Sequence, residues 1–201
     1  MKQLARFAAA ALVLAGAVQA QQQPAPPVRV RGVVQTFDGA TLTLATPNGA
    51  VVKLAVGADT GINGLAPKTM ADIGDNTFVG TTAVKDATGR WQATEVHIFP
   101  ETMRGAGEGH YAWDTPESTM TNAAVTGTVA KGNGRTLSLK YADGTVDVDV
   151  TPRTVIVALT AGDRSLLVRG ATVFALAVSD ANGAANAVAI VAETKGVKPP
   201  M

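Results

Sequence analysis

The sequence predicts an all-β protein made of two small five-stranded β-barrels in tandem, joined by a glycine-rich segment. Segments such as ATLTLAT (40–46) alternate apolar and polar residues with period two, as half-buried strands do. Turn signals such as PNG (47–49) separate them at roughly 8–12-residue intervals, which is typical of barrels and sandwiches. The third observation is an internal repeat, described below. Amphipathic helices do not alternate with these strands, which argues against a parallel α/β fold.

The N-terminus has the features of an export signal. Lys2 and Arg6 precede a short apolar run, and small residues at positions 18 and 20 predict cleavage before Gln21. The alternative is an N-terminal membrane anchor, but the apolar run is short for a bilayer span. We therefore expect a signal peptide over 1–20, a Pro/Gln-rich leader over 21–27, and no transmembrane segment after cleavage.

Composition narrows the possible partners. Removing residues 1–20 takes away two of 17 basic and none of 16 acidic residues, so the formal net charge becomes −1. This balance, with only 4% aromatic residues, does not favour nucleic acid as a partner. The chain has no cysteine, so a hydrophobic core and not a disulfide must stabilise it.

The first predicted unit covers 28–101. Strands are expected at 28–34, 40–46, 50–56, 78–86 and 91–99, with one short helix near 67–73. Closing such strands into a barrel hides their edges, and an OB-like five-stranded barrel has the right size. Gly32 lies inside the first strand, where glycine commonly permits a bulge or a sharp bend.

A second copy of this pattern covers 124–193. When Gly127 is aligned with Gly32, an offset of 95 places Leu137 and Leu139 on Leu42 and Leu44. AVKDATG (83–89) then matches AVSDANG (177–183), and ATEVHIFPE (93–101) matches ANAVAIVAE (185–193). The repeat predicts one barrel per copy, joined by a linker or clasp over 102–123 and followed by a tail over 194–201.

The opening VRGVV…G.TLTL….G…V.L.V and its second copy VTGTVAKGNGRTLSLKYADGTVDVDV carry a family resemblance. The chain resembles exported bacterial OB-like β-barrel proteins grouped as a domain of unknown function. Relatives with a segment similar to HIFPE.MRG.GEGH..WD are uncharacterised, and some are labelled metal-transport proteins. The resemblance implies the fold and an exported location, and it implies no established activity.

The stretch 97–114 holds both histidines of the chain. His97 aligns with Ala189 of the second copy, so the β-unit itself does not require an imidazole there, whereas Glu101 has a counterpart in Glu193. Strict alternation places His97 beside Glu95 on an outer, wetter face of its strand. That position suits a ligand or a hydrogen-bonding tether.

These residue types could hold a divalent metal, with zinc or copper as the candidate cofactor. The candidate ligands are His97, Glu101, Glu108, His110 and Asp114, and Met103 and Met120 could add soft ligands for copper(I). The spacing matches no established metal motif, so a solvated linker with ordinary charges is the simpler interpretation.

The same segment could instead act as a clasp. Three alternate glycines allow it to fold back, with Arg104, Tyr111 and Trp113 as partner or clasp residues. Asp114 would then cap a turn or pair with Arg104. Ser118 could be imagined as a nucleophile with His110 and Asp114, but no catalytic motif surrounds it, so a turn role is expected.

Together these features predict a periplasmic or secreted, non-enzymatic binding or accessory protein. Its partner would be a protein or small ligand of the cell envelope, contacted through the surface from His97 to Asp114. A metal-assisted hydrolase is the alternative from another class, and a purely structural envelope protein is the third.

Overall fold

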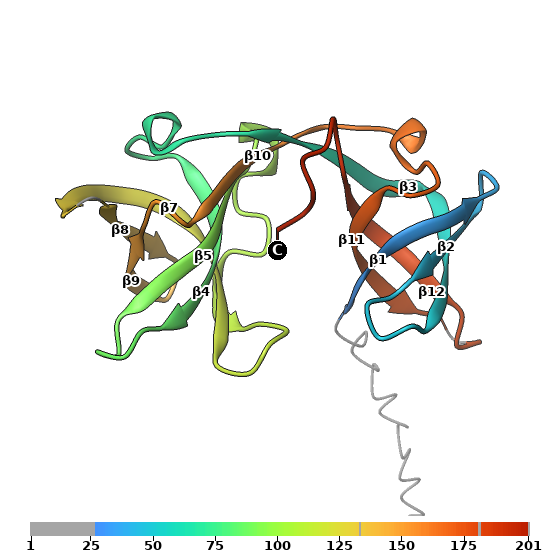
Figure 1. The fold of residues 1–201 in the computed structure, drawn as a ribbon, viewed down its shortest axis with the longest axis horizontal. Helices are drawn as coiled ribbons and strands as arrows, with labels where there is room; N and C mark the ends of the chain where they lie inside the picture. Colours follow the sequence, from blue (N-terminus) through green and yellow to red (C-terminus); the bar gives the residue numbers. More distant parts are fainter. Residues whose placement is uncertain (1–26, 133, 181, 201) are drawn as a thin grey trace, which may run out of the picture.

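The computed structural model describes residues 27–132, 134–180 and 182–200, so the predicted signal peptide and nearly all of the leader lie outside it. The all-β prediction is confirmed: twelve strands and three short 3₁₀ turns make up the regular structure of the described residues. None of those residues belongs to a helix long and apolar enough to cross a membrane. Figure 1 shows two groups of strands joined by an arch.

Strands form in both predicted segments, although β3 is much longer than the predicted strand at 50–56. The first repeat forms β1 (Val28–Phe37), β2 (Thr41–Ala45), β3 (Val51–Pro67), β4 (Phe78–Lys85) and β5 (Trp91–Ile98), and the second forms β7 (Ser118–Lys131), β8 (Gly134–Tyr141), β9 (Gly144–Val150), β10 (Val155–Ala161), β11 (Thr172–Ser179) and β12 (Ala185–Ala192). The 3₁₀ turns are η1 (Met70–Asp72), η2 (Glu101–Met103) and η3 (Arg164–Leu166), and β6 (Gly109–Ala112) lies in the linker.

One group of strands is a closed five-stranded barrel, here called the first ring. Its strands pair in the order β1, β2, β3, β12, β11 and back to β1. The β3–β12 pairing is parallel and the other four are antiparallel. Closure leaves no free edge, which is the expected solution for short strands in water.

The other group, the second ring, repeats this order with β7, β8, β9, β5 and β4. Its parallel closing pair, β9 with β5, involves only Trp91↔Val148 and Gln92↔Asp149. Strand β10 extends this closure, because it lies parallel to β5 over Val155–Ala158. The two rings therefore have the same strand order and directions.

The ladders do not follow the predicted boundaries at 28–101 and 124–193. Each ring takes three strands from one repeat and two from the other. The reason lies in β3, which continues as a single strand for 17 residues. Its register with β12 shifts at residues 57–60, and the residues beyond this irregularity carry the chain out of the first ring to β10 and deliver β4 to the second.

The two rings meet where β3 crosses β10 at the top of Figure 1. The end of β3 pairs antiparallel with β10, with Leu65 opposite Leu159 and Pro67 opposite Val157. Gly64 lies in this crossing, where an added Cβ would stand 2.6 Å from Thr194 Oγ1 of the C-terminal tail. A side chain there would separate the tail from the crossing strands.

Each ring has its own apolar core, and both repeats contribute to each. The first core includes Val34, Leu42, Leu44, Leu54, Val173 and Ile190. The second includes Val79, Val96, Val125, Leu137, Leu139 and Val148. A third buried cluster contains Leu65, Met120, Val157, Leu159, Phe174 and Val191, so it draws on strands of both rings and on the crossing.

The two in-strand glycines differ in what they do. Gly127 borders a bulge, because the β7–β8 register shifts between Val125 and Gly127. At Gly32 an added Cβ would stand 2.8 Å from the carbonyl oxygen of Ala45, so this glycine permits close approach of β1 to β2. The bulge of β1 lies further along, between Val34 and Thr36.

Candidate functional site

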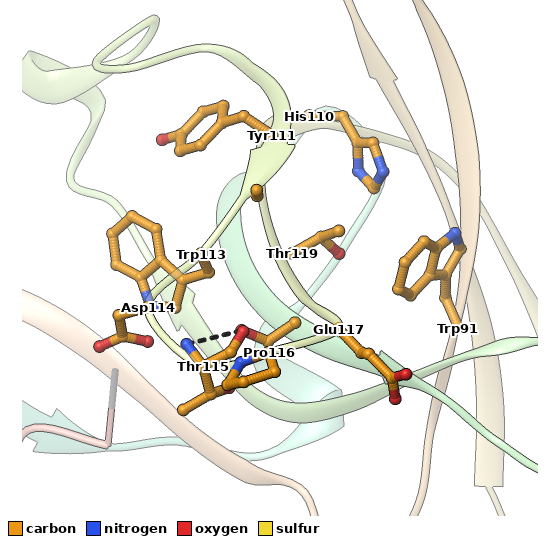
Figure 2. A pocket seen from close by; sticks show the side chains of 11 residues that line it. Trp91, His110, Tyr111, Trp113, Asp114, Thr115, Pro116, Glu117 and Thr119 are labelled. Atoms are coloured by element: carbon orange, nitrogen blue, oxygen red, sulfur yellow. Dashed lines mark hydrogen bonds between the residues drawn. The ribbon is translucent and has the colours of Figure 1, made fainter.

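The linker strand β6 presents two different faces, because side chains alternate along a strand. His110 points towards Trp91 of β5, whereas Tyr111 and Trp113 lie on the opposite side of the strand (Figure 2). Antiparallel pairing with β7, in which His110 lies opposite Thr121, fixes this orientation. His110 and Ala112 line a groove towards Trp91, and Trp113, which borders the same groove, packs towards the first ring.

The groove has a volume of about 670 Å³ and lies between Trp91 and the β6–β7 hairpin. Its lining residues are Trp91, His110, Tyr111, Ala112, Trp113, Asp114, Thr115, Pro116, Glu117, Ser118 and Thr119. The indole of Trp91 meets the imidazole of His110 edge-on, with 5.5 Å between centroids. The ring of Tyr141 stacks on His110 at 6.1 Å, so the imidazole contacts two aromatic rings.

The tip of the hairpin is tightly held. Trp113 N donates to Ser118 O, and Ser118 Oγ donates to Thr115 O at 2.7 Å. Ser118 therefore has the expected turn role. Glu117 has φ of 64°, a left-handed conformation that costs a non-glycine residue of order 1 kcal/mol or more. A carboxylate is thus kept at the rim of the groove at a position that glycine would occupy with less strain.

The groove contains few polar groups. His110 Nδ1 is 2.8 Å from Thr121 Oγ1, and burial lowers the pKa of the imidazole, which favours the neutral ring. Thr119 Oγ1 is buried and has no hydrogen-bond partner among the described residues. The Nζ of Lys85 lies 5.0 Å from the Trp91 ring centroid. These groups give the groove both donors and acceptors beside an aromatic wall.

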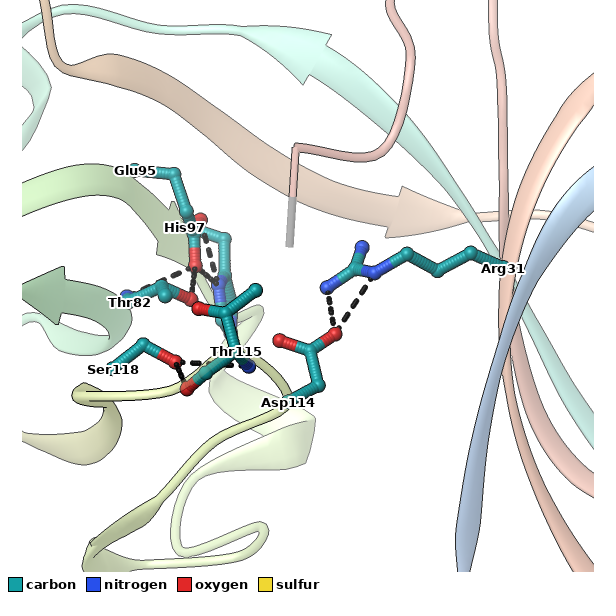
Figure 3. A network of polar contacts seen from close by, with 7 residues as sticks. All are labelled: Arg31, Thr82, Glu95, His97, Asp114, Thr115 and Ser118. Carbon is teal, nitrogen blue, oxygen red and sulfur yellow. Dashed lines mark hydrogen bonds and ion pairs between the residues drawn. The ribbon is translucent and has the colours of Figure 1, made fainter. Parts of the chain in front are cut away.

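The opposite face of β6 connects the two rings. Trp113 packs on Phe174 of β11 with 6.0 Å between centroids, and the guanidinium of Arg29 lies 3.8 Å from the Trp113 centroid. Asp114 accepts hydrogen bonds from Arg31 Nε at 2.9 Å and Nη2 at 2.6 Å (Figure 3). We call Trp113 and Asp114 with Arg29, Arg31 and Phe174 the clasp.

The predicted pairing of Asp114 with Arg104 is not formed. Arg104 instead pairs with Glu101 and donates to the carbonyl oxygen of Asn76. The neighbouring guanidinium lowers the pKa of the Glu101 carboxyl, although both groups are exposed. Glu101 and Arg104 thus stabilise the turn after β5 locally, and the contact between the rings is made by Asp114.

The prediction that His97 lies on a wetter outer face is wrong. His97 and Glu95 are 3% and 1% exposed. Thr82 donates to Glu95 Oε1 from its backbone N at 3.1 Å and its Oγ1 at 2.9 Å, and His97 Nδ1 is 3.2 Å from both carboxylate oxygens (Figure 3). The ring of Phe99 packs on the imidazole at 4.8 Å. Alternation placed Glu95 and His97 on the same face, but it could not show that this face is covered.

Gly80 of β4 makes room for this imidazole. It is paired with His97 on one side and with Asn122 of β7 on the other. A Cβ at Gly80 would stand 2.1 Å from His97 Nε2 and 2.5 Å from Asn122 Oδ1. Asn122 Nδ2 donates to Ala106 O at 3.1 Å, whereas Oδ1 has no hydrogen-bond partner among the described residues. The linker therefore covers a buried polar cluster.

Strand register corrects the alignment of the two repeats at this point. Both β4–β5 and β11–β12 contain a bulge, in which Thr94 and Val188 are the extra residues without a partner in the register. Matching the bulges gives an offset of 94, so the counterpart of His97 is Val191 and not Ala189. The counterpart of Glu95 is Ala189, and Glu101 no longer aligns with Glu193. The second copy still has no imidazole at the equivalent position.

The five predicted metal ligands are not brought together. Among the described residues, no group of three or more His, Cys, Asp or Glu side chains is arranged to hold a metal ion. His97 is paired with Glu95, His110 with Thr121, Glu101 with Arg104 and Asp114 with Arg31, while Glu108 is exposed on the linker. Met120 is buried in the third cluster and Met103 packs against it, so both methionines serve the core.

Sequence reasoning missed Trp91, Thr119, Lys85 and Tyr141 as residues around the groove. From the sequence, Trp91 is placed only in a strand. Its signal was that it is one of two tryptophans in the chain and directly follows a predicted turn. The other three come from separate elements that only the fold brings near Trp91. Comparisons with known protein families, curated proteins and solved structures found no match, so the family resemblance stays a prediction.

Proposed function

We propose that this protein is a non-enzymatic binding protein whose ligand site is the groove between Trp91 and the β6–β7 hairpin. The ligand we infer is a neutral, polyhydroxylated ring, that is, a saccharide. The observation that carries the proposal is the combination of an aromatic wall with the buried, unpartnered hydroxyl of Thr119 and the strained, exposed Glu117. The function remains that of a binding or accessory protein.

Size and shape support a small-molecule ligand. A groove of about 670 Å³ lies within the range of roughly 300–1,000 Å³ that holds small ligands. The flat indole of Trp91 can cover the apolar face of a sugar ring, because aromatic rings contribute large apolar area in a rigid form. Ala112 also lines the groove, and its small side chain takes up little of the space that a sugar ring would occupy.

Charge around the groove favours a neutral ligand. Lys85 Nζ, 5.0 Å from the centroid of the Trp91 ring, would repel a cationic ligand at that ring, and a saccharide that stacks on the same face would displace the lysine side chain. Glu117 at the rim would repel an anion in the same way. Hydroxyl groups, by contrast, can donate to the Glu117 carboxylate and either donate to or accept from Thr119 Oγ1.

A single-tryptophan variant allows a direct test. Trp113→Phe leaves Trp91 as the only tryptophan, so its fluorescence reports on the groove alone. We would titrate neutral hexoses, N-acetylhexosamines and their disaccharides, with choline and glucuronate as charged probes. We expect saturable fluorescence changes with neutral saccharides only.

The matched variant is Trp91→Leu in the otherwise native chain, followed by calorimetry or saturation-transfer NMR. We expect it to lose saccharide binding while Thr119→Val weakens it, with unchanged far-ultraviolet circular dichroism. The proposal fails if no neutral saccharide binds at millimolar concentration, or if Trp91→Leu binds as the native protein does.

The location and the barrel type complete the proposal. The N-terminal signal supports export to the periplasm or beyond, and mass spectrometry of the protein from fractionated cells tests it by looking for Gln21 as the mature N-terminus. The shared strand order of the two rings supports an OB-like form for both. The structural alternative is supported by the clasp, and it predicts that the saccharide titrations show no binding.

A further inference from the structure

Each ring is built from strands of both halves of the chain. We call residues 27–107 the N-half and residues 108–200 the C-half. The first ring joins β1, β2 and β3 of the N-half to β11 and β12 of the C-half. The second joins β7, β8 and β9 of the C-half to β4 and β5 of the N-half. Each half thus holds three strands of one ring and two of the other.

The buried cores are divided in the same way. In the first ring, Leu42 and Leu44 of the N-half share a core with Ile190 of the C-half. In the second, Val79 of the N-half shares a core with Leu139 of the C-half. Separating the halves would expose both cores to water, and the loss of that burial opposes separation.

The crossing shows that the exchange is symmetric. Residues 63–67 of β3 and 157–161 of β10 occupy equivalent places in the two repeats, and they pair antiparallel with each other. This is the geometry of two copies of one unit that exchange strands about a two-fold axis. Here the two copies belong to one chain.

The segment between β5 and β7 supplies the covalent connection but closes neither ring. Its only strand, β6, pairs with β7 among the described strands. Arg104–Glu108 is a largely exposed turn, with left-handed φ angles at Gly105 and Gly107. The connection therefore raises the effective concentration of one half around the other.

We propose that the N-half and the C-half are obligate binding partners, and that a second copy of this chain supplies either half to form an exchanged dimer. The surfaces that recognise each other are the strand edges and core faces that each half leaves open. The partner is thus a second copy of the same chain, and the linker determines how often exchange occurs within one chain.

The first test cuts the connection in the native chain. A site-specific protease sequence is inserted between Gly107 and Glu108, and the cut protein is examined by size exclusion and native mass spectrometry, with the uncut insertion variant as control. We expect the halves to remain a one-to-one complex that separates only in denaturant. Two halves that separate and are each folded as monomers would overturn the proposal.

The second test uses full-length chains that complement each other. Leu44→Asp damages the N-half and Leu139→Asp damages the C-half, so each chain alone should fail to fold. Refolded together, we expect a folded heterodimer built from the two intact halves. The control pair, Leu44→Asp with Val79→Asp, damages the N-half in both chains and should give no folded complex. Complementation by neither pair, or by both equally, contradicts half exchange.

Discussion

The two rings share a strand order but carry opposite chemistry on the face that each turns towards the linker. Aligning the two rings by strand register makes the following residues equivalent. Gly80, Thr82, Glu95 and His97 of the second ring correspond, in that order, to Phe174, Leu176, Ala189 and Val191 of the first. In the first ring this face is apolar, and Phe174 and Val191 pack in the third cluster. In the second ring it carries a buried carboxylate and imidazole that satisfy each other.

The comparison teaches that the fold itself does not require the polar set. In the first ring of strands, the phenyl group of Phe174 fills this position. In the second, the equivalent residue is Gly80, which has no side chain, and the imidazole of His97 from the neighbouring strand occupies the space. A buried ion pair or hydrogen-bonded pair seldom adds stability over apolar residues of similar size. We infer that Glu95 and His97 specify how the linker covers this ring.

The largest expected effect comes from breaking the polar pair on one side only. His97→Val leaves the buried Glu95 carboxylate with its hydrogen bonds from Thr82 but without the imidazole, and such a loss costs about 3–5 kcal/mol. Urea unfolding at constant m-value measures it. The double variant Glu95→Ala/His97→Val copies the first ring and should lose clearly less. Equal losses in the single and double variants would show that the pair has no coupling.

Filling the space at Gly80 should have the next largest effect. Gly80→Ala places a methyl group within 2.5 Å of both His97 and Asn122, and overpacking of this kind costs roughly 2–3 kcal/mol. Gly89→Ala is not a suitable control because of its positive φ, so Gly57→Ala, where the nearest atom is 4.0 Å away, serves instead. Thermal unfolding compares them, and a Gly80→Ala protein as stable as Gly57→Ala would contradict the proposed packing.

The clasp should respond more weakly, because its residues are only partly buried. Trp113→Ala removes the contact with Phe174 and the cation–π contact with Arg29, at a cost of roughly 1–2 kcal/mol. We expect a lower melting temperature and faster proteolysis within 102–117. The control is Asp114→Asn, which weakens only a partly exposed ion pair and should change stability less. If Trp113→Ala were digested at the same rate as the native protein, the clasp would not hold the linker against the first ring.

The smallest effect is a pH dependence at the groove. Burial lowers the pKa of His110 in the folded protein below its ordinary value of 6.5, so the unfolded chain binds the proton more tightly. Stability should therefore fall as pH decreases through 6.5 and level off below the folded-state pKa. His110→Gln should remove this part of the pH dependence of the unfolding free energy. If the stability of the native protein relative to His110→Gln stayed constant or fell as pH rises through 6.5, the assignment would be contradicted.

Much of the architecture was readable from the sequence because strand period and turn residues are local signals. Strands at 40–46 and 91–99 and the repeat offset near 95 agree with β2, β5 and their counterparts. Which strands pair is not local information. Asn63 and Gly64 even form a common turn dipeptide, and only the ladders show that β3 continues through them to pair with β10.

The candidate site was predicted in part. Trp113 packs on Phe174, whereas the five candidate metal ligands are not brought together among the described residues. The bulge at Thr94 and the cover provided by Phe99 decide the burial of His97, and neither is visible in an alternating pattern. The partner of Asp114, Arg31, is distant in sequence and reaches it only through strand exchange between the halves.

Strand exchange also sets the order in which this chain can acquire structure during its synthesis. The first ring pairs Val33 of β1 with Thr172 and closes on β12, which ends at Ala192. The earliest strands made must therefore wait for the last. A nascent chain of this kind keeps the first ring unclosed until translation is nearly complete.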